Sequence, residues 1–281
     1  MFDLFTEMFG YVFMVRALIV GLLVSLCASI LGVSLVLKRY SMIGDGLSHV
    51  GFGALSIATA LNQSPLVVSI PIVVAAAFLL LRISESSKIK GDAAIAIIST
   101  GSMAVGIIII SMTTGLNTDV CNYLFGSVLN MSKADVYLSV VLSLVVLALF
   151  IFFYHKIFAV TFDETFARAT GVKAGLYNMI IAVLTALTVV LGMRLMGSLL
   201  ISSLIIFPSL TAMRVSGNYR VVIAISSIVS LVCYFIGITV SYVYATPTGA
   251  SVVGANIIAF AIFTGTGSLA VVVKGLSKQT G

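Results

Sequence analysis

This chain consists of long runs of uncharged, mostly apolar residues. Short segments between these runs contain nearly all of its charged residues. Each run has about the 20 residues that a helix needs to cross the hydrocarbon core of a membrane, or more. Apolar residues follow one another without the alternation of a barrel strand, and helices satisfy their own backbone groups in lipid. The pattern therefore predicts an all-α, polytopic transmembrane helical bundle. The charge-free runs are 17–37, 46–81, 93–118, 136–154, 174–193, 195–213 and 221–273.

Two of these runs are too long for one helix, and each contains a turn signal. The first is interrupted at 61–65, which ends in Pro65, and the second at 245–249, which contains Pro247 and Gly249. Splitting both runs yields nine hydrophobic segments. The segment 198–213 is short and contains a proline, so a re-entrant segment is an alternative there. We therefore expect eight or nine membrane helices in a single domain over 1–281.

The basic residues indicate how the bundle is oriented. If the N-terminus is outside and nine helices cross, twelve of the 15 Lys and Arg residues fall on the cytoplasmic side, as membrane proteins prefer. We therefore expect the N-terminus outside and the C-terminus in the cytoplasm. The net charge of +6 reflects this rim, which favours anionic lipid headgroups over nucleic acid as its partner. The twelve are Lys38, Arg39, Arg82, Lys88, Lys90, Lys156, Arg168, Lys173, Arg214, Arg220, Lys274 and Lys278.

Composition and missing motifs exclude several classes of protein. Of 281 residues, 60% are apolar and 9% charged, whereas about a quarter of the residues of a soluble domain are charged. A water-soluble domain and a disordered chain are both excluded. The sequence has no GxxxxGK[ST], HExxH or GxSxG pattern, so it offers no nucleotide cradle, zinc pair or hydrolase nucleophile. We expect neither an enzyme nor a permanently bound cofactor.

Asp45 and His49 are the most informative polar residues within the apolar mass. They are four residues apart, so on a helix they share one face. A carboxylate and an imidazole at that spacing can hold a divalent ion, and this ligand mixture suits zinc or manganese. Two structural alternatives stand beside a metal site. Asp45 could pair with Lys38 or Arg39 at the membrane rim, and His49 could be a packed histidine bonded to a carbonyl.

A second feature is the segment 163–171, between two spans on the expected cytoplasmic side. Asp163 can cap a helix, Glu164 suits its first turn, and Gly171 can end it. With Phe162 and Phe166 four residues apart, we expect a short helix with an aromatic stripe. An ordinary helix resting on the bilayer surface would have the same pattern.

A third, weaker feature is the segment 120–126 on the expected outer side. It contains Asn122, Tyr123 and Phe125, which are candidates for contact with a partner protein. An aromatic belt at the membrane interface explains the same residues equally well.

In four stretches the chain resembles the integral-membrane permease subunits of bacterial ABC importers for zinc, manganese or iron. The first stretch is 32–39 leading into 42–49, where the family typically has GDALSHA, and the others are 122–126, 163–172 and 247–250. The resemblance covers nearly the whole chain, and the ordered set is more specific than any single stretch. Gly46 replaces the usual alanine, and Glu164-Thr165 replaces Pro-Glu.

The resemblance implies a permease in the bacterial plasma (inner) membrane that imports zinc or manganese. It implies three protein partners: a second permease copy, a cytoplasmic ATP-binding subunit and an extracytoplasmic metal-binding protein. It implies metal contacts at Asp45 and His49. It also implies that 163–171 is the coupling helix against the ATPase, formed by Asp163, Glu164, Thr165, Phe166, Ala167, Arg168, Ala169, Thr170 and Gly171.

Two other transport functions remain as alternatives. A secondary transporter or channel without an ATPase would need acidic residues inside several spans if it were coupled to protons. Apart from Asp45, the expected span interiors contain no Asp or Glu. An ABC permease for a metal chelate such as a siderophore would have no need of a bare ligand pair.

Overall fold

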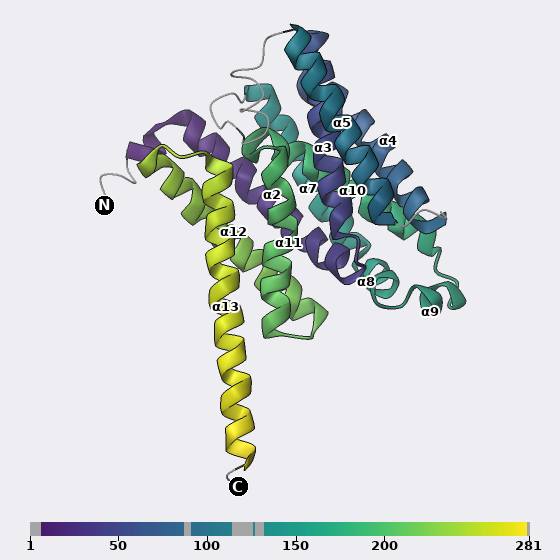
Figure 1. Cartoon of the computed structure of the whole chain (residues 1–281), viewed down its shortest axis with the longest axis vertical. Helices are drawn as coiled ribbons and strands as arrows, with labels where there is room; N and C mark the ends of the chain where they lie inside the picture. The colour runs from purple at the N-terminus through teal and green to yellow at the C-terminus, as the bar shows by residue number, and fades with distance from the viewer. Residues whose placement is uncertain (1–6, 87–90, 114–125, 127–131, 280–281) are drawn as a thin grey trace.

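The computed structural model describes residues 7–86, 91–113, 126 and 132–279. Within these ranges the regular secondary structure is entirely helical, as the apolar pattern predicted (Figure 1). The helices are α2 (Val12–Leu37), α3 (Ser41–Ala60), α4 (Pro65–Ser86), α5 (Gly91–Thr113), α7 (Lys133–Phe152), α8 (Tyr154–Phe162), α9 (Glu164–Ala169), α10 (Ala174–Met196), α11 (Ser198–Val215), α12 (Tyr219–Tyr244) and α13 (Thr248–Gln279).

The predicted hydrophobic segments each correspond to one helix of this structure. Seven helices within the described ranges are long and apolar enough to cross a membrane. The two remaining segments form α11, whose apolar part is the shorter Leu200–Val215, and α3. In α3, two ionisable residues and four glycines dilute the apolar character. The candidate metal ligands therefore lie on a helix that is less apolar than the seven.

Two ion pairs join the ends of neighbouring helices, one at each end of the bundle. Lys38, directly after α2, pairs with Glu164 of α9 at 3.2 Å. Arg194, near the last residue of α10, pairs with Asp135 in the first turn of α7, also at 3.2 Å. Figure 1 shows α8, α9 and the α11–α12 turn toward the end where the C-terminus lies. We call this the basic end, because it carries Lys38, Lys156, Arg168, Lys173, Arg214 and Arg220.

The segment after α7 differs from the sequence prediction. One short helix was expected between the spans, but α8 precedes it and follows α7 after the single residue Phe153. Ile157 and Val160 of α8 are buried. The polar residues His155 and Lys156 near the start of α8 interrupt the apolar pattern, so the sequence did not predict this helix.

Helix α2 lies close to α11 because Gly32 has no side chain. A Cβ atom at Gly32 would collide with the backbone carbonyl of Ile205 in α11. Small residues let membrane helices approach in this way. The α2–α11 contact matters for function because α11 also contacts the candidate site in α3.

We predict that Gly32→Ala destabilises the protein by about 1–3 kcal/mol, since overpacking forces backbone shifts. The measurement is thermal unfolding of the purified chain in detergent. Gly175→Ala is the matched control: Gly175 is an exposed helix residue with no atom within 4 Å of the position its Cβ would occupy. Equal unfolding temperatures for the two variants would contradict the packing argument.

Candidate functional site

Asp45 and His49 lie on one face of α3, as their spacing predicted. Asp45 Oδ2 is 3.8 Å from His49 Nε2, and the other carboxylate oxygen accepts a hydrogen bond from Ser202 Oγ at 2.9 Å. The His49 side chain is 12% exposed and the Asp45 side chain 36%. The imidazole is therefore enclosed, whereas the carboxylate is open on one side.

The contacts of this pair match neither of the two structural alternatives. Lys38 contacts Glu164, and in the described part of the chain the polar partners of the Asp45 carboxylate are His49 and Ser202. A packed histidine would bond its second ring nitrogen, but His49 Nδ1 is buried and has no hydrogen-bond partner in the described part of the chain. An imidazole held this way leaves a nitrogen without compensation, which is costly unless it has another use.

The geometry of the pair admits one metal ion but does not enclose it. Zinc lies about 2.0–2.1 Å from a histidine nitrogen and about 2.0–2.2 Å from a carboxylate oxygen, so two such ligands on one ion are at most roughly 4.3 Å apart. The observed 3.8 Å between Nε2 and Oδ2 is within this limit. No group of three or more His, Cys, Asp or Glu side chains suited to a metal occurs among the residues that the structure describes. A single copy would thus offer two ligands to an ion and leave its remaining positions open.

Sequence reasoning missed Ser202, which contacts Asp45 from α11. This helix begins directly after α10, through the single residue Gly197 with φ of 84°, a conformation that glycine adopts readily. Residues Met196 to Ser198 are buried. Nothing in the apolar run 195–213 distinguishes Ser202 from its neighbour Ser203. Only the packing of α11 on α3 selects it.

The segment 163–171 forms the short helix α9 with the predicted caps. Asp163 accepts a hydrogen bond from the backbone N–H of Phe166 at 2.8 Å. At the other end, Gly171 has φ of 83° and Val172 N–H bonds back to the carbonyl of Ala167. These bonds satisfy backbone groups at both ends, which a helix of six residues needs to persist outside a longer one.

The aromatic stripe predicted for this helix is wrong. Phe162 is the last residue of α8. Asp163 follows with an extended backbone conformation, so α8 ends there and α9 begins as a separate helix. Phe162 packs against Tyr219 with ring centroids 5.7 Å apart. Phe166 remains 65% exposed. Phe162 is itself 54% exposed, but of the two phenylalanines only Phe166 lies on α9.

Lys38 joins α9 to three other helices. Its ammonium donates to Glu164 Oε2 at 3.2 Å, to the Val160 carbonyl at 3.0 Å and to Asn178 Oδ1 at 2.6 Å. Its side chain is only 6% exposed. Lys38 immediately precedes the left-handed Arg39 (φ 60°), where the chain turns from α2 into α3. A buried charge thus connects α9 with the corner that leads to Asp45.

The carboxylate of Glu164 is the main acceptor of this network, as the Lys38 ammonium is its main donor. It accepts hydrogen bonds from Arg168 at 2.6 Å and from Asn178 at 3.1 Å in addition to Lys38. Partial burial acts to raise its pKa, but hydrogen bonds from Arg168, Asn178 and Lys38, with the Lys38 charge, lower the pKa to about 2.

Asn122, Tyr123 and Phe125 lie outside the described residues, so their contact role stays a prediction.

A family model supplies the identification that the geometry alone does not. Residues 10–266 match the model of the ABC 3 transport family. The chain belongs to this family.

Two relatives illustrate what members of the family are named for. The manganese transport system membrane protein MntC of Halalkalibacterium halodurans is 28% identical over 89% of this chain and 85% of its own length. The high-affinity zinc uptake system membrane protein ZnuB of Buchnera aphidicola is 30% identical over 83% of this chain and 89% of its own.

A solved structure has the same fold. It is described as PsaBC from Streptococcus pneumoniae in complex with Fab. This chain superimposes on it with a TM-score of 0.84 at 27% identity, over 93% of this chain and 94% of that one.

We predict that Glu164→Gln removes a pH-dependent part of the stability. Because the folded pKa of Glu164 is about 2 and its ordinary value 4.5, the carboxylate stabilises the fold above pH about 4.5. That stabilisation is lost as the pH falls from 4.5 through 2. Thermal unfolding at pH 6 and pH 3 should show a larger decrease for the wild type than for the variant.

Arg168→Gln is the intermediate variant for this measurement. It removes the largest of the contributions that lower the Glu164 pKa and leaves the contacts from Lys38 and Asn178, so it should remove a part of the pH dependence and Glu164→Gln all of it. An identical decrease in wild type and Glu164→Gln would contradict the assignment.

Proposed function

We propose that this chain is the membrane-spanning permease subunit of an ATP-driven importer for a divalent transition metal ion, zinc or manganese. Family membership and the names of the relatives support this function. The observation that carries it is the Asp45–His49 pair, at a separation that one ion can bridge, beside an unpartnered ring nitrogen. The protein is a multi-pass component of the bacterial plasma membrane and a transport subunit, and ATP hydrolysis occurs on a separate chain.

The open side of Asp45 supports a site completed by a second permease copy. With two ligands from each copy, a homodimer would offer four, which is the number that zinc prefers. The metal is cargo rather than a resident cofactor. Incomplete enclosure by one copy favours release, because transport requires binding weak enough to reverse.

Nine crossings with the N-terminus outside agree with the contacts between helix ends. Under that topology the N-terminal end of α7 and the C-terminal end of α10 meet on the outer face, where Arg194 pairs with Asp135. The basic end then faces the cytoplasm, in agreement with the positive-inside preference. The loop with Asn122, Tyr123 and Phe125 faces outward, where the extracytoplasmic metal-binding protein delivers its ion to the single permease domain, 1–281.

Helix α9 is the contact through which the ATPase drives this permease. It belongs to the basic end, its caps and the Lys38–Glu164 pair hold it in place, and Phe166 is exposed on its surface. Exposed aromatic side chains are frequent anchors of protein interfaces. Movement of α9 would be transmitted through Lys38 to the α2–α3 corner and from there to Asp45 and His49.

We predict that Asp45→Asn and His49→Ala each abolish most metal uptake by the assembled transporter, since each removes a ligand. Ser202→Ala should weaken metal binding about 10–100-fold, as loss of a group that orients a ligand does. The measurement is radioactive zinc or manganese uptake, with direct metal binding for Ser202→Ala. Asp92→Asn, which alters an exposed acid in the first turn of α5, is the control. Wild-type uptake in both ligand variants would refute the site.

We also predict that Phe166→Ala lowers metal-stimulated ATP hydrolysis and co-purification of the ATPase at least severalfold, while metal binding is retained. Phe152→Ala is the matched control, because Phe152 is 78% exposed but lies at the end of α7. If both variants keep wild-type hydrolysis and co-purification, α9 does not make this contact.

A further inference from the structure

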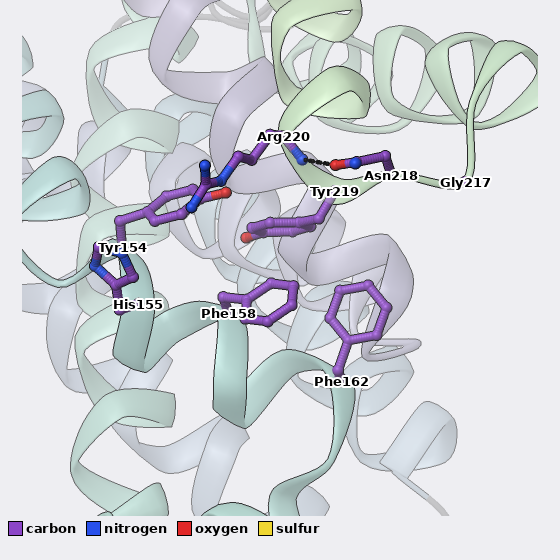
Figure 2. A pocket seen from close by; sticks show the side chains of 8 residues that line it. All are labelled: Tyr154, His155, Phe158, Phe162, Gly217, Asn218, Tyr219 and Arg220. Atoms are coloured by element: carbon purple, nitrogen blue, oxygen red, sulfur yellow. Dashed lines mark hydrogen bonds between the residues drawn. The ribbon is translucent and has the colours of Figure 1, made fainter.

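A cleft of about 470 Å³ opens at the basic end between α8 and the start of α12. Four aromatic side chains and two basic ones dominate its lining, as Figure 2 shows. Neither the metal pair nor α9 contributes to it, so the transport site does not account for it. Its lining residues are Tyr154, His155, Phe158, Phe162, Gly217, Asn218, Tyr219 and Arg220.

The aromatic wall of this cleft is held in place from below. Tyr219 is buried, and its hydroxyl is 2.7 Å from Ser34 Oγ on α2. Tyr154, Phe158 and Phe162 pack around its ring, with centroids 5.2–5.8 Å away. A cleft built on such a core is preformed.

The most polar side chains that line the cleft are basic, those of Arg220 and His155. Arg220 and His155 are exposed, and Figure 2 shows the Arg220 side chain extending toward Tyr154 and His155. The Arg220 backbone N–H is fixed by Asn218 Oδ1 at 3.1 Å. No acidic residue lines the cleft. A guanidinium placed this way suits a phosphate group, which it can bind with two parallel hydrogen bonds.

A second, apolar slot of about 430 Å³ continues from the same residues. It shares Tyr154, His155 and Arg220 with the cleft and adds four apolar residues: Ile30, Phe150, Ile151 and Ile223. Ile30 lies seven residues before the end of α2, which is roughly 10 Å along the helix from the basic end. The slot therefore leads from the charged rim into the apolar part of the bundle surface.

We propose that the cleft and the slot together bind one anionic glycerophospholipid. Its phosphate lies against Arg220 and His155, and an acyl chain occupies the slot along Ile151 and Ile223. A free phosphate would leave the slot unused, and a zwitterionic lipid would bring its own cation to a site that already holds the Arg220 guanidinium. Basic pockets between membrane helices commonly select anionic headgroups in this way.

The test uses the full-length, delipidated chain in detergent, with lipid binding followed by native mass spectrometry. The probes are phosphatidylglycerol, phosphatidylcholine and glycerol 3-phosphate. We expect phosphatidylglycerol to bind most tightly, at one per chain. Arg220→Gln should weaken that binding about tenfold, as expected for the loss of a charge-assisted hydrogen bond. Ile151→Trp, which fills the slot from its exposed wall, should weaken it without changing any charge.

Arg214→Gln is the matched control, because it removes the same charge from the basic end outside the cleft. Arg214 lies instead over the ring of Phe260, 5.9 Å from its centroid. Equal losses in the Arg220 and Arg214 variants would overturn the proposal in favour of a diffuse charge effect. Equal affinity for glycerol 3-phosphate and phosphatidylglycerol would also overturn it. Unchanged lipid binding by Arg220→Gln with loss of ATPase co-purification would assign the cleft to the ATPase.

Discussion

Polar groups inside a membrane bundle must find their partners within the protein, because lipid offers none. Here the buried hydroxyl of Tyr234 donates to the carbonyl of Ala17, and Ser230 donates to the carbonyl of Ser25. Both bonds join α12 to α2. At one end of the bundle, Asp135 and Arg194 neutralise each other with little exposure. The buried Nδ1 of His49 departs from this rule, as do a few other buried polar atoms such as Asn256 Oδ1, and His49 differs from them in lying beside the Asp45 carboxylate.

The same constraint explains how a short surface helix can influence a site within the bundle. A buried ammonium such as that of Lys38 is costly unless several acceptors surround it. It therefore draws together α8, α9 and α10 at the end of α2. Asp45 lies seven positions after Lys38 in the sequence, across the turn at Arg39. Displacement of α9 would remove one of the three acceptors of Lys38, so the Lys38 ammonium is a physical link between α9 and the α2–α3 corner.

The basic end of the bundle carries two surfaces of different chemical character. The basic end combines the capped helix α9, with its exposed Phe166, and an aromatic cleft that contains Arg220. The first is suited to a protein partner and the second to an anionic lipid. Asp45 and His49 lie in the first half of α3. Glycines of the same helix, such as Gly53, allow α5 to pack closely against it. The proposed transport site and the proposed lipid site thus use separate residues of one fold.

The sequence by itself determined the class of fold and the residues of the candidate pair. Charge-free runs require helices in lipid, and a spacing of four places Asp45 beside His49 on any helix. The caps of α9 were predictable for the same reason, because Asp163 and Gly171 act on backbone within a few residues of themselves.

Tertiary structure alone decided the contacts between distant segments. Ser202 approaches Asp45 across 157 positions, and Lys38 meets Glu164 across 126. Neither pair leaves a local signal, since an apolar run accepts a serine anywhere and a rim lysine has many acids within reach. The separation of Phe162 from Phe166 was also hidden, because spacing predicts a shared face only while one helix continues. Which helices pack together depends on side-chain shape summed over whole helix faces, and no single segment of the sequence contains that information.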